Sequence, residues 1–371
     1  MRLVKVRSRR DIRNFVRLPF ELYKNTPQWI PPLNTIIRNV ITKGSPVMSV
    51  DREFFLVMDG RQPVARLGVY INRNVIEHGN RAGSFTLFES YNDVYVADLL
   101  FHAADNWFKE REIVRYIGTD SPTNGDDYKA ILIRNFDDPP FVNANYNLPY
   151  YQELLEEIGF KMYKRFACFK YDLTKPIDEK HVRLIEEAKK RYDFRIVAPD
   201  MKNLDKVAWD LRLIMENSIP DEWIEARPPS YEEMLRIVDD MKKFSDPELI
   251  AIAYHGDEPI GFVGSSPNYN EILKELRGRL YPFGWLKLSR KRKSIKTFRL
   301  FVVFVVKNFQ GKGVSFAMYY HVLQNAIRKG YVRAEGGNVD FENKKSFQDA
   351  LAAGGELYKE YATFEKIIKP G

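Results

Sequence analysis

The chain has 371 residues, a length that suits two domains, and its single cysteine excludes internal disulfides. Apolar residues make up 44% of it and aromatic residues 14%, enough for buried cores, while no run of about twenty apolar residues predicts a membrane span. The net charge of +8 permits an anionic partner: a nucleotide-bearing cofactor, a nucleic acid or an acidic lipid. With no signal-peptide pattern and with Cys168 interpreted as a buried structural thiol, we expect a cytoplasmic protein.

The first part of the chain alternates strand and helix patterns. Period-two and apolar runs predict strands at 3–6, 54–58, 63–72, 83–89, 113–118 and 161–171. Apolar spacings of three and four predict helices at 8–23, 95–111 and 148–158. A charged helical stretch at 174–192 then reads as a linker.

The second part repeats this order. Strands are expected at 194–197, 249–264 (a hairpin), 300–306, 331–341 and 361–364, with helices at 201–217, 229–241, 316–330 and 343–354. We therefore predict an α+β fold of two tandem domains, 1–173 and 193–371, each a mixed, mostly antiparallel sheet flanked by helices. An insertion at 267–285 precedes a basic segment, 287–296, that is either a solvated loop or a neighbour of the cofactor's phosphates.

The most informative segment is the end of the strand at 303–306 and the turn that follows it. The turn reads Gln310-Gly311-Lys312-Gly313-Val314-Ser315 and opens the helix that ends at Gly330. A glycine-paired turn before a helix directs several backbone N–H groups at one spot, at the positive end of the helix dipole. Strand, turn and helix together predict a site for a phosphate or pyrophosphate.

This turn resembles the acyl-CoA-binding motif of the GNAT superfamily of N-acyltransferases, Gln/Arg-x-x-Gly-x-Gly/Ala. The resemblance implies acetyl-CoA or another acyl-CoA as co-substrate, with its pyrophosphate on the turn and its pantetheine arm along Val303 and Val305. The implied cofactor residues in the turn are Gln310, Gly311, Lys312, Gly313, Val314 and Ser315. The first domain lacks such a turn and looks like a GNAT fold that has lost CoA binding.

A second family feature follows the motif. Asn343 begins a helix that closes at Gly354-Gly355, the interval that GNAT members show, and the resemblance adds Asn343 to the cofactor site. Many GNAT enzymes carry a tyrosine seven positions after that asparagine, which protonates the departing thiolate, and here the position holds Ala350. Either another group such as Tyr358 is the acid, or the thiolate leaves without one, since a thiol pKa is near 8.5.

Acyl transfer to an amine also needs a base and an acceptor pocket. Among the acidic residues near the cofactor strand, Glu335 is the first choice for the base. The alternative is that Glu335 is an ordinary surface carboxylate without a catalytic role. A polar and aromatic set in the first domain suits an amine-bearing sugar, amino acid or peptide, although loop capping and edge packing explain it equally well. That set is Asn124, Tyr146, Asn147 and Tyr151.

Three functions remain open. The first is a CoA-dependent N-acyltransferase acting on a small-molecule or peptide amine, with the acceptor near the domain interface and with no metal and no membrane partner. The second is an aminoacyltransferase that uses aminoacyl-tRNA, the one reading with a nucleic-acid partner. The third is a non-catalytic acyl-CoA-binding protein.

Overall fold

The computed structural model describes residues 1–44, 51–77, 80–122, 127–175, 179–219, 228–280 and 283–368, of which 72–77 and 80–82 are described by their main chain alone. The chain divides into two compact units. Unit 1 comprises Met1–Phe166, Tyr269–Lys293 and Lys359–Gly371, and unit 2 comprises Ala167–Asn268 and Ser294–Tyr358. Strands β7 (Lys161–Asp172) and β13 (Glu356–Ile367) each begin in one unit and end in the other. The domain ranges 1–173 and 193–371 stay a prediction.

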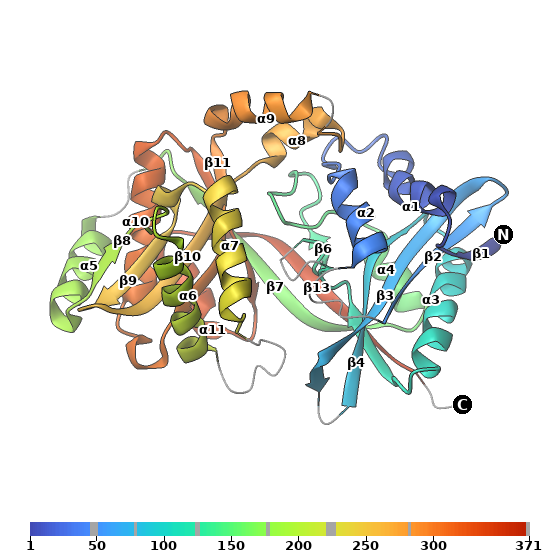
Figure 1. Ribbon diagram of the computed structural model, residues 1–371, viewed down its shortest axis with the longest axis horizontal. Coiled ribbons are helices and arrows are strands. Elements are labelled where there is room, and N and C mark those ends of the chain that lie inside the picture. Colours follow the sequence, from blue (N-terminus) through green and yellow to red (C-terminus); the bar gives the residue numbers. More distant parts are fainter. Residues whose placement is uncertain are drawn as a thin grey trace. The chain divides into compact units, whose positions relative to one another are not determined.

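Unit 1 is a mixed sheet between two layers of helices (Figure 1). Its strands follow the order β1-β2-β3-β4-β5-β13, and the neighbours in this order pair antiparallel except β4 with β5, which are parallel. The elements are β1 (Arg2–Lys5), α1 (Arg9–Leu22), α2 (Asn34–Lys43), β2 (Arg52–Asp59), β3 (Gln62–Glu77), β4 (Asn80–Ser90), α3 (Val94–Lys109), β5 (Arg115–Gly118), β6 (Ile131–Arg134), α4 (Tyr151–Glu157), α8 (Asn270–Leu276) and α9 (Gly284–Lys291).

Two apolar layers hold unit 1 together. The predicted helix around 95–111 is confirmed as α3, whose apolar stripe packs with α4 on one sheet face. Helices α1 and α2 contribute Phe15, Val16, Ile37 and Val40 to a second cluster, which includes side chains of β2 and β3. Ser8 is the N-cap of helix α1. The Ser8 hydroxyl accepts a hydrogen bond from Asp11 N–H, and the Asp11 carboxylate accepts one from Ser8 N–H.

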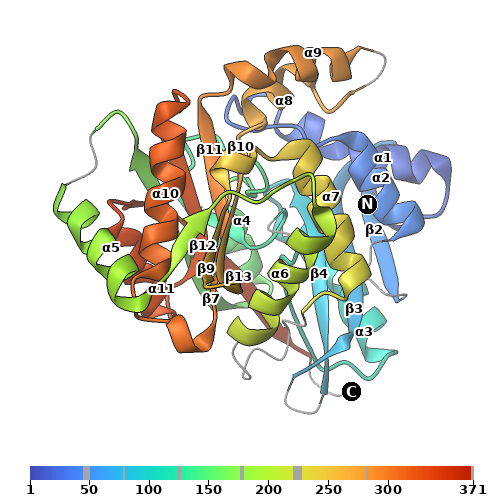
Figure 2. The ribbon, with the colours of Figure 1, turned by 60° about the vertical axis from the view of Figure 1, so that its left-hand side comes forward.

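Unit 2 has the same layered plan. Its strands run β8-β9-β10-β11-β12-β7, with β11 and β12 parallel. Helices α5, α10 and α11 share one cluster with the sheet, and α6 and α7 share another with its opposite face (Figure 2). The elements are α5 (Glu179–Tyr192), β8 (Arg195–Val197), α6 (Leu204–Ser218), α7 (Tyr231–Phe244), β9 (Ala251–His255), β10 (Glu258–Pro267), β11 (Thr297–Val305), α10 (Val314–Arg328), β12 (Arg333–Asp340) and α11 (Lys344–Ala352), with short 3₁₀ turns at Pro247–Leu249 and Lys307–Phe309. A third 3₁₀ turn, Arg292–Ser294, begins in unit 1 and ends in unit 2.

The predicted fold class is confirmed, while several segments differ from the prediction. Helix α2 and strand β6 were not expected. The basic segment, expected in its simpler interpretation as a solvated loop, begins inside α9, where Lys287 and Lys291 are one turn apart and both pair with Glu275 of α8. No helix in the described part of the chain is long and apolar enough to cross a membrane.

Candidate active site

The site begins where two parallel strands of unit 2 separate. Strand β11 pairs with β12 from Thr297↔Arg333 to Leu300↔Gly336, and residues 301–305 of β11 have no registered partner in β12. On its other edge β11 continues to pair with β10 as far as Val305, through a register shift between Gly264 and Ser265. The shift leaves one extra residue in β11. Such a β-bulge bends the strand that contains it. A fork therefore opens between β11 and β12, with an unpaired backbone edge on β11.

The glycine turn lies at the end of that strand. Gly311 has φ +75° and Gly313 has φ +80°, the left-handed region that residues with a Cβ avoid. A Cβ built on Gly311 would meet nothing within 4 Å, and one on Gly313 would lie 3.2 Å from the Cβ of Ala188. Gly313 is also the N-cap of α10, with no side-chain cap. The predicted turn and its helix are confirmed.

The backbone N–H groups of this turn are available. Within the described chain, Gln310 N–H bonds to Lys307 O, Lys312 N–H bonds to Phe309 O and Ala317 N–H bonds to Gly313 O. The groups without a partner are those of Gly311, Gly313, Val314, Ser315 and Phe316. Unsatisfied donors at a helix N-terminus form an anion site, so these residues fit a phosphate or pyrophosphate.

The side chains of the motif have internal uses. Gln310 Nε2 donates to Val305 O over 3.1 Å and so fastens the turn to the end of β11. Ser315 Oγ donates to Asp349 Oδ2 of α11 over 2.7 Å. Asn343 caps α11, where its Oδ1 accepts from Ser346 N over 3.1 Å. The free hydrogen-bond donors of the motif therefore lie mainly in its main chain.

Helix α5, interpreted from the sequence as a linker, contributes to the turn. Its Ala188 Cβ would lie 3.2 Å from a Cβ built on Gly313, and the Lys312 ammonium lies 5.5 Å from the ring centre of Tyr192 and 4.7 Å from that of Phe309. Such cation–π contacts keep the charge of Lys312 beside the free amides. The sequence carries no local signal for this contact, because Ala188 and Gly313 are far apart along the chain.

The two predicted catalytic residues touch each other. The Tyr358 hydroxyl donates to Glu335 Oε2, and Arg299 Nε lies 3.0 Å from Glu335 Oε1. The side chains of Arg299 and Glu335 are fully buried, and the two residues are paired in register one step before the fork. Arg299 was missed, although an arginine between Phe298 and Leu300 in an apolar strand demands a buried carboxylate partner.

A different tyrosine lies beside Ala350. Tyr171 of β7 is buried, and its hydroxyl lies 3.5 Å from Ala350 O. Its ring would be 3.1 Å from a Cβ on Gly336, the last residue of β12 that pairs with β11. Burial raises the pKa of Tyr171 well above its usual value, which keeps its proton in place. Tyr171 thus brings a phenol to the fork from a strand.

The predicted acceptor residues lie in unit 1, around a cavity of about 10 Å³, close to the least that holds one water. Tyr146 donates to Phe136 O over 3.0 Å. Asn147 accepts from Leu132 N over 2.6 Å and donates to Leu132 O over 3.0 Å. Asn124 lies outside the described residues. The observed contacts give Tyr146 and Asn147 a use in packing, and their acceptor role stays a prediction.

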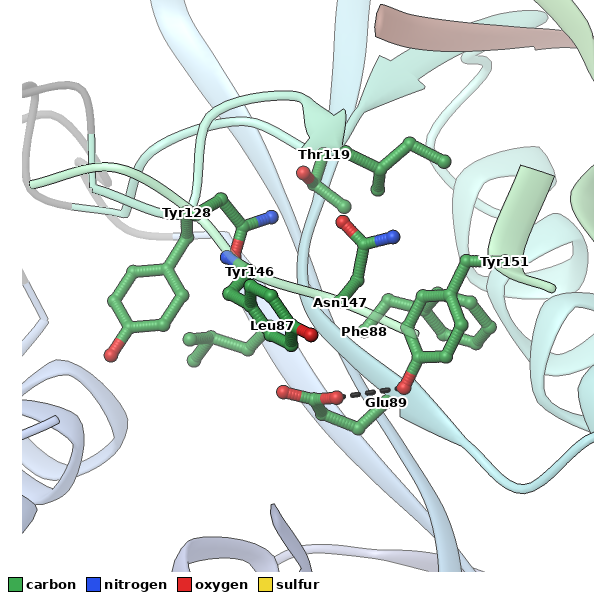
Figure 3. Close-up of a pocket in the computed structure, with 10 residues that line it drawn as sticks. Leu87, Phe88, Glu89, Thr119, Tyr128, Tyr146, Asn147 and Tyr151 are labelled. Carbon is green, nitrogen blue, oxygen red and sulfur yellow. Dashed lines mark hydrogen bonds between the residues drawn. The ribbon is translucent and has the colours of Figure 1, made fainter. Parts of the chain in front are cut away.

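Tyr151 belongs to a buried polar cluster at the same cavity. Figure 3 shows its hydroxyl directed at Glu89, to which it donates over 2.7 Å. Tyr23 donates to the same Glu89 oxygen over 2.6 Å, and Arg66 lies 3.4 Å from the other. Burial raises the pKa of Glu89 above its usual value, and Arg66 and the tyrosine hydroxyls oppose that effect.

Unit 1 repeats the fork without the turn. Strands β4 and β5 pair in parallel only from Gly83↔Tyr116 to Phe85↔Gly118, and the cavity with Glu89 lies beyond that point. The helix that follows β4 starts at Asp93, whose side chain accepts from Val96 N over 3.3 Å. A capped N-terminus leaves fewer donors for a phosphate than the turn in unit 2. Among the residues described, no group of three or more His, Cys, Asp or Glu is placed to hold a metal.

Comparison with known proteins agrees with this geometry. The family model described as "Acetyltransferase (GNAT) family" matches residues 213–347, which span the fork and the turn. A bacterial ceramide synthase of Caulobacter vibrioides is 28% identical over 99% of this chain and 97% of its own length. Protein YghO of Escherichia coli is 25% identical over 97% of this chain and 94% of its own length.

A solved structure extends the similarity in fold to the whole chain. The tandem GNAT protein of the clavulanic acid biosynthesis pathway superposes with a TM-score of 0.59, covering 100% of this chain and 99% of that one at 10% identity. At this identity the likeness concerns the fold alone. Residues 213–347 therefore match the GNAT acetyltransferase family, and the chain as a whole has the fold of a tandem GNAT protein.

Proposed function

We propose that the protein is a CoA-dependent N-acyltransferase whose acyl-CoA site is the turn and fork of unit 2. One observation carries the proposal: five free main-chain amides at the N-terminus of α10 follow a strand whose neighbour has separated from it. The amides fit the pyrophosphate of CoA, and the unpaired edge of β11 near Val303 and Val305 fits its pantetheine amides as an added strand. Lys312 supplies a nearby positive charge.

In this reaction the acceptor nitrogen forms a bond to the thioester carbon, the carbon–sulfur bond breaks, and one proton passes from nitrogen to sulfur. Glu335 and Tyr358 form a hydrogen-bonded pair that can take up and return that proton. Arg299 holds the Glu335 carboxylate in place and stabilises its charge. Tyr171, beside Ala350, is the second phenol able to serve the departing thiolate.

The acceptor we propose is the primary amine of a long-chain amino alcohol. A relative that aligns over almost the whole chain is a ceramide synthase, and a ceramide is the amide of a fatty acid with such an amine. The donor would then be a long-chain acyl-CoA. A non-catalytic acyl-CoA-binding protein is the second candidate, favoured by Ala350 at the usual tyrosine position and by the full burial of Glu335.

The test is thiol release from a panel of acyl-CoA thioesters, from acetyl to hexadecanoyl, mixed in turn with long-chain amino alcohols, amino sugars and amino acids. We expect release to need both substrates, with the amide detected by mass spectrometry. Gly313→Glu, which places a side chain and a charge in the turn, is the control that removes CoA binding. Binding without turnover for every amine would leave the non-catalytic function, and no binding of any acyl-CoA would refute both.

A further inference from the structure

The insertion between β10 and β11 forms two short helices in unit 1. Helix α8 is anchored: Ile272 and Leu276 are buried, and Asn270 donates to Pro140 O over 2.8 Å. Helix α9 lies on the outer side of α8 in both views of the ribbon (Figures 1 and 2). None of the eight described residues of α9 is buried. A helix of this length is not stable through its own hydrogen bonds, so a helix without burial indicates a surface that meets a partner.

Helix α9 and the residue before it, Phe283, carry both apolar and basic side chains. Phe283 is 73% exposed and Trp285 is 52% exposed, while Leu286 and Leu288 are half-buried. Residues 270–293 hold eight Lys and Arg against two Glu, a net charge of +6, compared with +8 for the whole chain. The insertion thus concentrates most of the chain's excess positive charge beside exposed aromatic side chains.

Only part of that charge is neutralised within the protein. Glu275 of α8 pairs with Lys287 over 2.5 Å and with Lys291 over 2.9 Å. Arg290 and Lys293 are exposed, and neither forms an ion pair with any residue that the structure describes. Successive residues of a helix are rotated by about 100°, so Trp285 lies on a different face of α9 from Lys287 and Lys291. The aromatic side chain therefore does not share the face that pairs with Glu275.

We propose that α9 and the residues that lead into it form a peripheral binding surface for anionic phospholipid bilayers. A short helix with tryptophan, phenylalanine and leucine beside lysine and arginine is the pattern of an interfacial helix, whose aromatic rings enter the headgroup region while its cations meet lipid phosphates. Nucleic acid has the same charge, and Phe283 and Trp285 could also stack on its bases. Leu286 and Leu288 add aliphatic side chains to this helix, which favours the acyl boundary of a bilayer over a base. This proposal replaces the expectation that the protein has no membrane partner.

The experiment is co-sedimentation of the full chain with vesicles of phosphatidylglycerol and phosphatidylcholine in equal parts, and with vesicles of phosphatidylcholine alone. We expect binding to the anionic vesicles that falls with added salt, and little binding to the neutral ones. Each basic residue near an anionic surface contributes about fivefold to partitioning, so Arg290→Glu with Lys293→Glu should weaken binding at least about 25-fold. The matched charge control is Lys202→Glu with Lys242→Glu, two exposed lysines in unit 2, which should leave binding unchanged.

The aromatic contribution has its own pair of variants. Trp285→Ala should weaken binding to anionic vesicles about tenfold. Trp209→Ala, at a tryptophan of α6 that is 50% exposed, should not. Circular dichroism and thermal unfolding verify that each variant is folded. Vesicle binding by the charge variants and by the tryptophan variants is measured without turnover. The outcome is therefore independent of the proposed acyl transfer. The proposal is overturned if the wild type binds neither kind of vesicle, or binds neutral and anionic vesicles equally. It is also overturned if Trp285→Ala and Trp209→Ala bind vesicles alike. A third contrary result is transfer RNA that displaces the vesicles and binds Trp285→Ala as well as it binds the wild type.

Discussion

Replacing Gly313 by glutamate separates the effect of the turn on folding from its effect on CoA. At φ +80° a residue with a Cβ costs about 1–2 kcal/mol, and the new Cβ would lie 3.2 Å from Ala188. For a domain of this size each kcal/mol lowers Tm by roughly 2–4 °C, so we expect a loss of about 2–8 °C without ligand. The introduced carboxylate would also meet the CoA pyrophosphate.

The assay is thermal unfolding with and without CoA. A ligand at 100 times its Kd stabilises the folded state by about 2.7 kcal/mol, or roughly 5–11 °C for the wild type. We expect this shift to vanish in Gly313→Glu. The matched control is Gly354→Glu, because Gly354 has φ +84° and open space around its Cβ position, at the C-terminal end of α11. That variant should lose similar stability and keep the CoA shift. A full shift in Gly313→Glu would refute the assignment of the turn.

Three further variants test the proton-handling groups and the buried carboxylate. Tyr358→Phe removes the hydroxyl that Glu335 accepts, and we expect turnover to fall about 10²-fold or more in steady-state assays; Tyr254→Phe, which breaks a similar tyrosine–carboxylate bond, should keep its rate. Tyr171→Phe should slow turnover while leaving the CoA-induced shift in Tm intact, and an unchanged rate would limit Tyr171 to packing. Because the folded-state pKa of Glu89 is raised, its contribution to stability is complete below pH 4.5 and declines as pH rises through the raised pKa. Glu89→Gln should therefore flatten that decline in urea unfolding followed against pH, and an unaltered profile would show that Glu89 does not cause it.

The strand, the glycine turn and α10 were predictable because their signals are local. Gly311 and Gly313 occupy left-handed positions within one turn, and the helix that follows has its apolar residues three and four apart. The same reasoning located α3, whose buried side chains lie on the expected stripe. In these elements neighbouring residues along the chain decide the conformation, so one sequence is enough.

The partners of the site were not predictable, because they come from distant segments. Arg299 meets Glu335 through the register of two parallel strands, and Tyr171 reaches Ala350 from a strand almost 180 residues earlier. No pattern near Ala188 indicates that α5 contacts the turn. The polar set around Tyr146 shows the opposite problem, since its residue types suit ligand binding while the observed hydrogen bonds join it to its own main chain.

Amide hydrogen exchange with and without CoA tests most directly whether the main chain of unit 2 holds the co-substrate. The N–H groups of residues 311 and 313–316 have no acceptor within the described chain, so they should exchange quickly in the free protein. With CoA bound we predict slower exchange in these residues and along 301–305, and no change at β4 and β5 of unit 1. Protection confined to unit 1, or exchange in the turn that CoA leaves unaltered at saturation, would contradict the assignment.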